Sequence, residues 1–310
     1  EAYDDDGNAD PSKMKDIVSL LEGIQGYDLA DRMRDNFISS KQLASPEIMF
    51  SVRYLAPNTT HSMDLYYAAW TTCGVTRDLV DAFECTDGQK WGESPLTVPV
   101  DESLLATGDL AEVNKAERAK LFQNRDRRLY ETVNHSGVAD FSIDGQEGDP
   151  VTITNQMQTG FGMMKLIQPT KEMPGYSTIS DADVIILRYA EVLMMIAEAE
   201  NEVNGPTQKA YDAVNRVRVR SGQPELPAGL SKEQMRERIR NEWRVEFVFE
   251  GHRYFQLKRW KLMEELVDGA TDPALPTYIK VFKPAFYYFP LPQAEIDKAN
   301  GVLTQDPNYK

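Results

Sequence analysis

Acidic and basic side chains recur at helical spacing in the stretch from Ile185 to Trp260. They begin with Arg188, Glu191, Glu198 and Glu202, which follow one another at intervals of three, seven and four residues. These intervals place the side chains on one face of a helix. The other positions are apolar almost all round, as in a helix buried on every side. Carboxylates in such a place can hydrolyse a glycosidic bond, hold a metal ion or pair with buried guanidinium groups.

The sequence lacks the motifs that would favour catalysis or metal binding. A di-iron bundle needs Glu-x-x-His, but Phe249 stands three residues before His252. Zinc-protease, nucleophile-elbow, P-loop and dinucleotide-binding patterns are also absent. The other histidines, His61 and His135, are too dispersed to suggest a triad or a metal site. We therefore expect no catalytic residue, no metal and no cofactor, with an enzyme acting through its acidic clusters as an alternative.

The favoured interpretation is an internal lattice of ion pairs that joins three helices. The second helix carries arginines, and the third carries glutamates and arginines at the same kind of spacing. We expect the glutamates to be structural partners of the arginines, and Glu198 to face Arg218. The expected members of the lattice are Arg188, Glu191, Glu198, Arg218, Arg244, Glu246, Glu250 and Arg253.

Aromatic residues in a loop-rich region suggest ligand binding. Tyr66, Tyr67, Trp70 and Trp91 lie where periodicity is poor, and binding residues are often carried by loops. Trp70 follows the two tyrosines at intervals of four and three, so two of these rings can form a platform. A flat ring covers the apolar face of a sugar, while nearby polar groups bond its hydroxyls. The alternative is that Tyr66, Tyr67 and Trp70 pack under the loop as a small hydrophobic cluster.

Helix-breaking and helix-capping residues predict where the scaffold helices begin and end. Asn204-Gly205-Pro206 should end the first helix and place its proline early in the second. Ser231 and Gln234 form a capping box that opens the third helix. Trp243 and Trp260 lie on this third helix, so we expect them in the core.

Outside the scaffold the pattern predicts shorter elements. These are a helical region over 12–37 with Ser12 as its cap, a strand over 47–54, a short helix around Thr76–Phe83, a helix over 110–124, a hairpin turn at Asp144-Gly145, a strand pair within 151–167, and an extended strap from Tyr278 to Pro292 packed on the scaffold.

Several blocks of the sequence resemble the signature of the SusD/RagB family. They include SPEIMFSVRY, RYAEVLMMIAEAENEVNG, NRVRVRSG, EFVFEGHRYFQLKRW and YYFPLPQAEIDKANGVLTQDPNY, in the order of the family and covering Pro46 to Tyr309. Two positions depart from the usual pattern. Gln256 stands where the family commonly has Asp, and Trp243 stands where it commonly has Arg.

The resemblance implies a mostly α fold, the SusD-like α-α superhelix. In it a tetratricopeptide-like helical scaffold carries a loop-rich, partly β insertion. We expect residues 1–45 to form an N-terminal helical segment, 46–180 the mixed α/β insertion, and 181–310 the scaffold with its C-terminal strap, all within one SusD/RagB-type domain. Family members begin with a secretion signal and a lipidated cysteine, which are not in this sequence, so we expect it to be part of a longer protein.

The function that the resemblance implies is capture of a glycan or oligosaccharide at the extracellular face of the outer membrane. The partner would be a SusC-type TonB-dependent transporter, and the protein would reach the membrane only through a lipid anchor. Two other functions stay open. The same architecture could bind oligopeptides, or a helical-repeat scaffold could bind proteins without any small ligand.

The composition excludes other partners. A net charge of −15 at pH 7 disfavours binding to nucleic acid and direct binding to an anionic membrane. The sequence contains no apolar run long enough to span a membrane. Cys73 and Cys85 can form a disulfide in an oxidising compartment or remain free, partly buried thiols.

Overall fold

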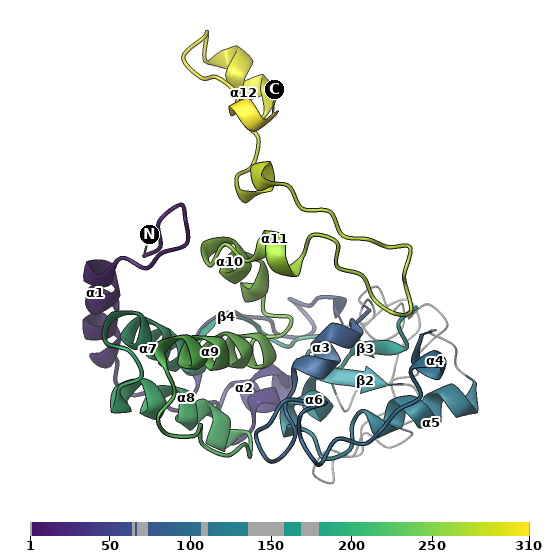
Figure 1. Ribbon diagram of the computed structural model, residues 1–310. Helices are drawn as coiled ribbons and strands as arrows, with labels where there is room; N and C mark the ends of the chain where they lie inside the picture. The colour runs from purple at the N-terminus through teal and green to yellow at the C-terminus, as the bar shows by residue number, and fades with distance from the viewer. Residues whose placement is uncertain are drawn as a thin grey trace.

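The computed structural model describes residues 2–63, 66, 74–106, 111–135, 158–168 and 180–309. Their fold is mostly helical, with two small two-stranded sheets (Figure 1), as the resemblance predicted. Tyr67, Trp70, Cys73 and the turn expected at Asp144-Gly145 lie outside the described residues. No helix in the described part of the chain is both long and apolar enough to cross a membrane. The predicted division into three segments stays a prediction.

The centre of the molecule is the helical hairpin of α7 (Tyr189–Asn204) and α8 (Gln208–Arg220). Helix α7 is buried on nearly every side, as its apolar circumference predicted. Gly205 turns the chain with φ 77°, a left-handed conformation that favours glycine. Thr207 then caps α8 by accepting a hydrogen bond from the Ala210 amide, so Pro206 precedes the cap instead of lying inside the helix.

The predicted third helix is two helices. Helix α9 (Lys232–Glu246) opens with the predicted capping box of Ser231 and Gln234. The chain then leaves helical geometry at Phe249 (φ 66°) and Gly251 (φ 84°), and α10 (His252–Arg259) starts in a new direction. A positive φ cannot continue a right-handed helix, which is why the two do not merge.

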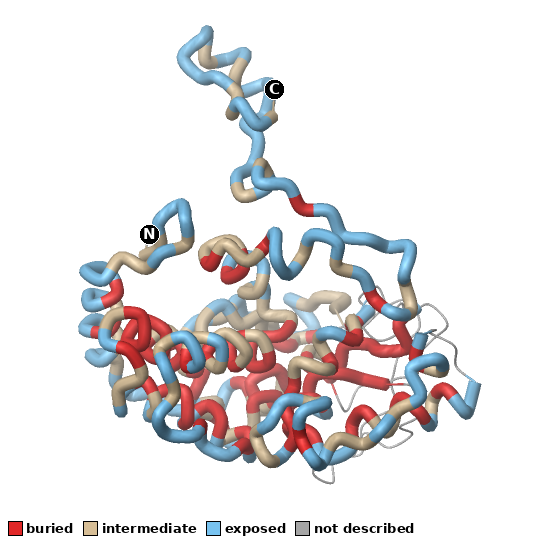
Figure 2. The backbone as a smooth tube through the Cα atoms, viewed as in Figure 1, coloured by how far each residue is buried: buried red, intermediate tan, exposed pale blue. Residues whose placement is uncertain are grey.

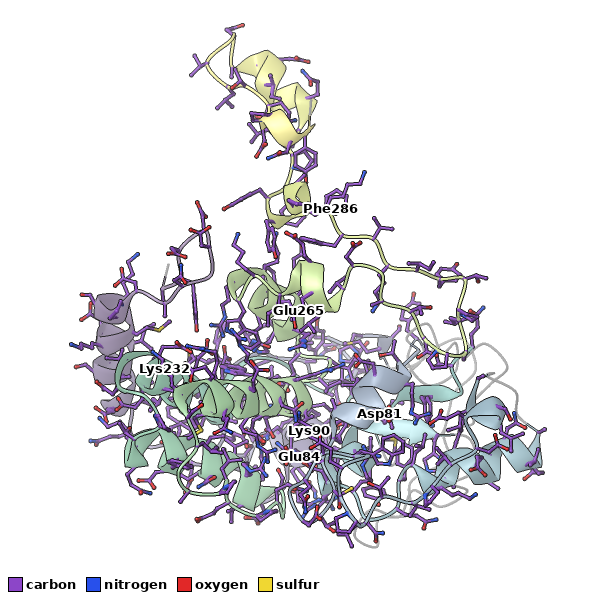
Figure 3. All side chains as sticks on the ribbon, in the orientation of Figure 1. Asp81, Glu84, Lys90, Lys232, Glu265 and Phe286 are labelled. Carbon is purple, nitrogen blue, oxygen red and sulfur yellow. The ribbon has the colours of Figure 1, made fainter. Side chains whose placement is uncertain are left out.

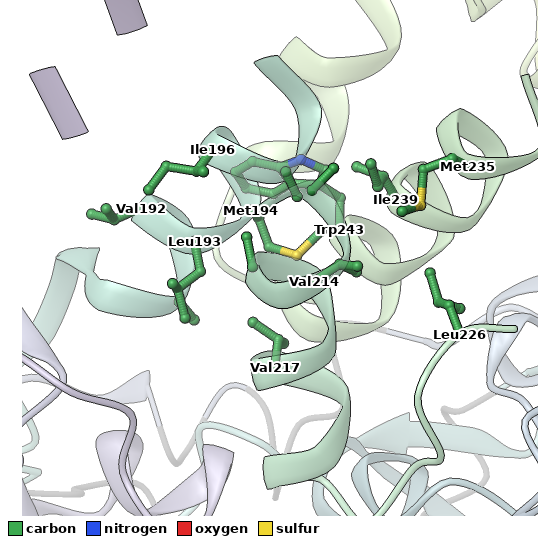
Figure 4. Packing of buried hydrophobic residues seen from close by; sticks show 14 of the residues in the cluster. Val192, Leu193, Met194, Ile196, Val214, Val217, Leu226, Met235, Ile239 and Trp243 are labelled. Atoms are coloured by element: carbon green, nitrogen blue, oxygen red, sulfur yellow. The ribbon is translucent and has the colours of Figure 1, made fainter. Parts of the chain in front are cut away.

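The core fills the space between α7, α8 and α9. Figure 4 shows Trp243 of α9 packed among Met194, Val214 and Ile239, and Trp260 belongs to the same buried cluster. Both tryptophans are nearly fully buried, which confirms the prediction that they lie in the core. The burial of this cluster ties the three helices into one rigid body.

The N-terminal helix α1 (Pro11–Glu22) lies beside α7 (Figure 1) and buries Met14 and Val18 there. Its cap is Asp10, whose side chain accepts hydrogen bonds from the amides of Ser12 and Lys13. The expectation that Ser12 caps the helix was therefore wrong by two residues. Pro11 occupies the first turn, where its missing amide hydrogen costs nothing. Short helices η1 (Met33–Phe37) and α2 (Ser39–Gln42) follow.

The rest of the described chain contributes the sheets and several short helices. Strand β1 (Ile48–Val52), predicted from its alternation, pairs antiparallel with β4 (Val184–Arg188), with Ile48 opposite Arg188. Cys85 is a free, buried thiol. The remaining elements are α3 (Arg77–Ala82), α4 (Glu102–Leu105), α5 (Glu112–Lys120), α6 (Arg127–Thr132), and the antiparallel pair β2 (Val133–His135) and β3 (Phe161–Met163).

The C-terminal segment leaves the body of the molecule (Figures 1 and 2). Phe282 still packs against Leu257 and Met263, but Phe289 is 75% exposed. Figure 3 shows Phe286 of this segment well above the body. The expectation of a strap packed along the scaffold was therefore wrong for most of the segment, although Tyr287 also packs against this cluster. The elements that follow α10 are α11 (Met263–Leu266), η3 (Pro284–Tyr287), α12 (Gln293–Lys298) and η4 (Pro307–Tyr309).

Candidate functional site

A buried network of ion pairs lies beneath the scaffold helices. Arg188, at the junction of β4 and α7, is 1% exposed and reaches three carboxylates. It pairs with Glu47 at 2.6 Å, Glu246 at 2.7 Å and Glu250 at 2.7 Å. One guanidinium thereby joins Glu47, which precedes β1, to the end of α9.

Three arginines of this network share one carboxylate, that of Glu246. It is fully buried and pairs with Arg128 at 2.9 Å, with Arg188 and with Arg220. Burial alone would raise the pKa of the Glu246 carboxyl, but the three arginines together hold that pKa well below its ordinary value. The carboxylate therefore stays charged and has no proton to give or take near neutral pH.

Two further buried cations belong to the network. Lys165 is fully buried and donates to the Glu246 carbonyl oxygen at 2.8 Å and to the Glu250 carboxylate. Burial lowers the pKa of Lys165 to about 8, against the opposing charge of Glu250. Arg218 of α8 pairs with Glu84 at 2.9 Å and with Glu242 at 3.0 Å.

Other members of the predicted lattice lie outside this network. Glu198 pairs with Arg259 of α10 instead of Arg218, because it lies ten residues beyond Arg188 and faces the N-terminal segment. It also accepts hydrogen bonds from the Tyr3 hydroxyl at 2.5 Å and from Trp260 Nε1 at 2.8 Å.

Arg244 and Arg253 also depart from the expected lattice. Arg244 pairs at the surface with Asp78 of α3. Arg253 forms no ion pair within the described part of the chain, although the charge of Asp78 acts on it. Burial, and then repulsion from Arg244, lower the pKa of Arg253 to about 10.

The arrangement is poorly suited to acid–base catalysis. Within the network each buried carboxylate faces at least one guanidinium or ammonium group. A general acid needs a pKa near the working pH, whereas the pKa values of Glu246 and Glu250 are held below their ordinary range by their cations, against the effect of burial. Among the described residues no group of three or more His, Cys, Asp or Glu side chains is placed to hold a metal ion.

Glu191 differs from Glu246 and Glu250 in the direction of its pKa shift. Burial raises the pKa of its carboxyl to about 7, with only partial opposition from Arg188. The nearest basic group is His252, whose Nδ1 lies 3.7 Å from the Glu191 carboxylate and whose own pKa is lowered by burial. Glu191 is thus a carboxyl that exchanges its proton in the neutral range.

We expect Glu191→Gln to remove a pH dependence from folding. The folded pKa of about 7 exceeds the ordinary carboxyl value of 4.5, so the folded state binds more protons between these values. This group therefore lowers the stability of the wild type as pH rises through the window, and the glutamine variant lacks that contribution. Urea unfolding at about pH 5 and pH 8 measures the difference. An equal pH dependence in both proteins, with exposed Glu237→Gln as control, would contradict the raised pKa.

Glu191 lies at a groove between α1 and α10. The groove has a volume of about 720 Å³ and is lined by the N-terminal segment, α1, α7, α10 and the residues around η3. Sequence reasoning did not identify it as a site. The available signal was the pair of departures from the family pattern, since Trp243 and Gln256 both line this groove.

The aromatic candidates that the structure describes are Tyr66 and Trp91. Trp91 is half-buried and packs against the cluster formed by α3, α6 and their neighbours. The guanidinium carbon of Arg77 lies 4.9 Å from the centre of its ring and that of Arg125 lies 5.8 Å away. Tyr66 is 47% exposed. The platform expected from Tyr66, Tyr67 and Trp70 stays a prediction, because two of its members lie outside the described residues.

Known proteins share both sequence and fold with this chain. The model of the SusD family matches residues 49–309. Two curated SusD-like proteins of Formosa agariphila, P2 and P25, are 32% identical over 137 residues and 37% identical over 124 residues. These matches cover 42% and 39% of this chain, and 26% and 23% of the relatives. The matched part is thus about a quarter of the length of the curated relatives.

Solved structures agree over almost the whole chain. A SusD-like protein from Bacteroides fragilis superposes with a TM-score of 0.73 and 25% identity, over 96% of this chain and 62% of that one. A SusD-like carbohydrate-binding protein from the same organism gives 0.69 and 22%, over 93% and 59%. Surface glycan-binding protein A from Bacteroides thetaiotaomicron gives 0.60 and 23%, over 96% and 58%. By the family match over residues 49–309 and by this shared fold, the chain belongs to the SusD family.

Proposed function

We propose that this protein binds oligosaccharides at the cell surface and is not an enzyme. The family match over residues 49–309 carries the proposal. It is supported by two proteins of the same fold whose names describe carbohydrate and glycan binding. The pairing of the buried carboxylates with cations favours binding over hydrolysis, because a glycosidase needs two carboxylates free to flank a sugar.

The proposed contact surface is the loop region that carries Tyr66, Tyr67, Trp70 and Trp91. The loop around Trp91 is held by its own hydrogen bonds, from Ser94 Oγ to Asp87 at 2.7 Å and from the Gly92 amide to Thr97 Oγ1 at 3.0 Å. An aromatic ring on a rigid loop loses little conformational entropy when a sugar stacks on it. Trp91 is therefore the described residue that best fits this role.

Delivery to a transporter is part of the proposal. A protein of this family would act beside a SusC-type TonB-dependent transporter at the extracellular face of the outer membrane, held there by a lipid anchor. The net charge of −15 supports an anchor over direct contact with the membrane, since an anionic leaflet repels an acidic surface.

The test begins with a glycan array, followed by calorimetric titration with the glycan that binds. Trp91→Ala is expected to weaken binding by about 2 kcal/mol, roughly thirty-fold in Kd, because a stacked aromatic is removed. Tyr254→Ala, which removes a partly exposed aromatic from α10, is expected to leave the affinity unchanged.

A second variant separates stacking from packing at this position. Trp91→Leu keeps apolar volume against the core but lacks a flat ring, so it should also weaken binding. Thermal melts of both variants accompany the titrations. Full affinity in Trp91→Leu or in Trp91→Ala would show that the indole is a packing residue and would exclude it from the site.

A further inference from the structure

Glu191 lines the groove between α1 and α10 without a cation to balance its charge. Its side chain is 16% exposed, so it is largely shielded from water but open to a ligand in the groove. Arg188 is the cation whose charge acts on it, but that guanidinium is bound to three other carboxylates. Within the described residues no lysine or arginine pairs with Glu191. Burial without such a partner disfavours the charged form, which is why the pKa of this carboxyl is raised to about 7.

His252 faces Glu191 across a short gap. Its Nδ1 lies 3.7 Å from the Glu191 carboxylate, which is longer than a hydrogen bond. Burial lowers the pKa of this imidazole, so the ring is neutral at neutral pH. A neutral imidazole has one nitrogen that accepts a hydrogen bond. An ammonium group placed between the two residues can therefore donate to the carboxylate and to the imidazole at once.

Buried polar groups of the same groove lack hydrogen-bond partners. Gln256 is 4% exposed, and among the described residues neither its amide nitrogen nor its amide oxygen has a partner. Nε1 of Trp243, a residue 3% exposed, lacks a partner as well, and the centre of its ring lies 5.9 Å from that of His252. Burying an unpaired polar group costs free energy, which a ligand recovers when its hydroxyl groups bond to that group.

Exposed aromatic rings stand at the mouth of the groove. Phe255 is 66% exposed and Tyr288 is 51% exposed, and both line it. A flat ring covers the apolar face of a sugar. The groove has a volume of about 720 Å³, within the usual range of roughly 300–1,000 Å³ for ligand sites. Acceptors for an ammonium group, unpaired partners for hydroxyl groups and aromatic surface therefore meet in one cavity.

The other charged groups of the groove balance one another. Within the described part of the chain they are three bases, Lys258, Arg259 and Lys261, and three acids, Asp4, Asp5 and Glu198. Arg259 pairs with Glu198, and the two lysine ammonium groups lie 4.9 Å and 4.0 Å from the centres of aromatic rings. Neither lysine contributes to the pKa shift of Glu191, which arises from burial and from the charges of Arg188 and Glu250. Glu191 is thus the acid in surplus.

We propose that this groove binds an amino sugar, a sugar unit that carries a free ammonium group. The ammonium donates hydrogen bonds to Glu191 and His252. The hydroxyl groups bond to Gln256, and the sugar ring packs against Phe255. As the ammonium binds, the proton of the Glu191 carboxyl passes to the solvent, and an ion pair takes its place. A neutral sugar leaves that carboxylate unpaired, so the site discriminates against it.

Three disaccharides with the same ring frame test the proposal by calorimetric titration of the chain of residues 1–310. They are the disaccharide of glucosamine, its N-acetylated form and cellobiose, which carry an ammonium, an acetamide and a hydroxyl group at the same carbon. We expect saturable binding of the glucosamine disaccharide, about tenfold tighter than that of the other two. Glu191→Gln should remove this preference, because an amide does not balance a cation. Physiological ionic strength screens general attraction to the acidic protein.

Proton release separates ion pairing from a merely structural role of Glu191. At about pH 6 an amine is charged, whereas a carboxyl with a pKa of about 7 is mostly protonated. Pairing then releases a proton to the buffer. Titrations in two buffers with different ionisation enthalpies measure this release, which we expect in the wild type and not in Glu191→Gln.

Matched variants control for net charge and for aromatic content. Glu237→Gln removes an acid of α9 that is 69% exposed, and it should leave the affinity for the glucosamine disaccharide unchanged. Phe255→Ala should weaken binding about tenfold, because a ring that stacks on the sugar is lost. Tyr254→Ala removes the neighbouring ring, which does not line the groove, and should have no effect. Thermal melts show which variants are folded, and Phe255→Ala provides the test if Glu191→Gln is not.

The proposal is overturned by absence of saturable binding or by equal affinity for the three disaccharides. Unchanged affinity or unchanged proton release in folded Glu191→Gln overturns it as well, as does unchanged affinity in Phe255→Ala. Neither Tyr66 nor Trp91 lines the groove, so failure of the loop region to bind a glycan leaves this site standing.

Discussion

Replacing Glu246 with alanine is expected to destabilise the protein by about 5 kcal/mol, the upper end for breaking a buried pair. The substitution leaves Arg128, Arg188 and Arg220 without the carboxylate that they share. All three arginine side chains are at most 5% exposed, so water cannot solvate the guanidinium charges that lose this partner. Since whole domains are stable by only about 5–15 kcal/mol, we expect little folded protein.

Solubility on expression, circular dichroism and urea unfolding measure this effect. Glu246→Gln keeps the shape of the side chain but not its charge, and should fold with a clearly lower midpoint. Glu237→Ala is the matched control on the same helix, because Glu237 is 69% exposed and pairs with Arg240 at the surface. Its loss should cost no more than about 1 kcal/mol. Similar stabilities for the Glu246 and Glu237 alanine variants would show that the network contributes little.

The second large effect is expected at Glu198, where alanine should cost about 3 kcal/mol. Glu198 is the shared acceptor of Arg259, Tyr3 and Trp260, and thereby joins α7 to α10 and to the N-terminal segment. Burial would raise the pKa of this carboxyl, but Arg259 and the hydrogen bonds lower it overall. Loss of the carboxylate should release the segment before α1 as well as lower the melting temperature.

Thermal melts and limited proteolysis test this second prediction, with cleavage before Pro11 as the expected new site. Glu22→Ala removes a half-exposed glutamate of α1 that pairs with Lys209, and should change neither observable. The double variant Glu198→Leu with Arg259→Met should recover much of the stability, because it leaves no buried charge unpaired. If the double variant is less stable than Glu198→Ala alone, the pair is not the source of the effect.

Local features of the fold were predictable because their signals lie close together in the sequence. The apolar circumference of α7 predicted its burial, and Ser231 with Gln234 predicted the start of α9. The break between α9 and α10 was missed although Gly251 stands there, because a single glycine inside a helical pattern does not specify its own φ. The exposure of the C-terminal segment was not predicted, because its aromatic residues indicate that it packs but not against which surface.

The partners within the ion-pair network were less predictable. The sequence indicated that Arg188, Glu246 and Glu250 lie on buried helix faces, but it did not identify Glu47, Arg128 or Lys165 as their companions. These residues lie 85 to 141 positions away from their partners in the chain, as the separations of the bonded pairs show. Helical spacing identifies residues on one face, but it carries no information about which neighbour that face meets.

The sequence by itself determined the family and the helical scaffold, because both follow from local periodicity and from motifs in order. It also determined that acidic and basic residues lie on the same buried helices, where they can neutralise one another. Only the tertiary structure decided that Glu198 faces Arg259, that Glu191 stands beside His252, and that Gln256 lies unpaired under a groove. Each of these depends on how α10 turns after Gly251. A few backbone torsions there set the direction of the whole helix, and its neighbours then fix the pKa and the hydrogen bonding of each side chain.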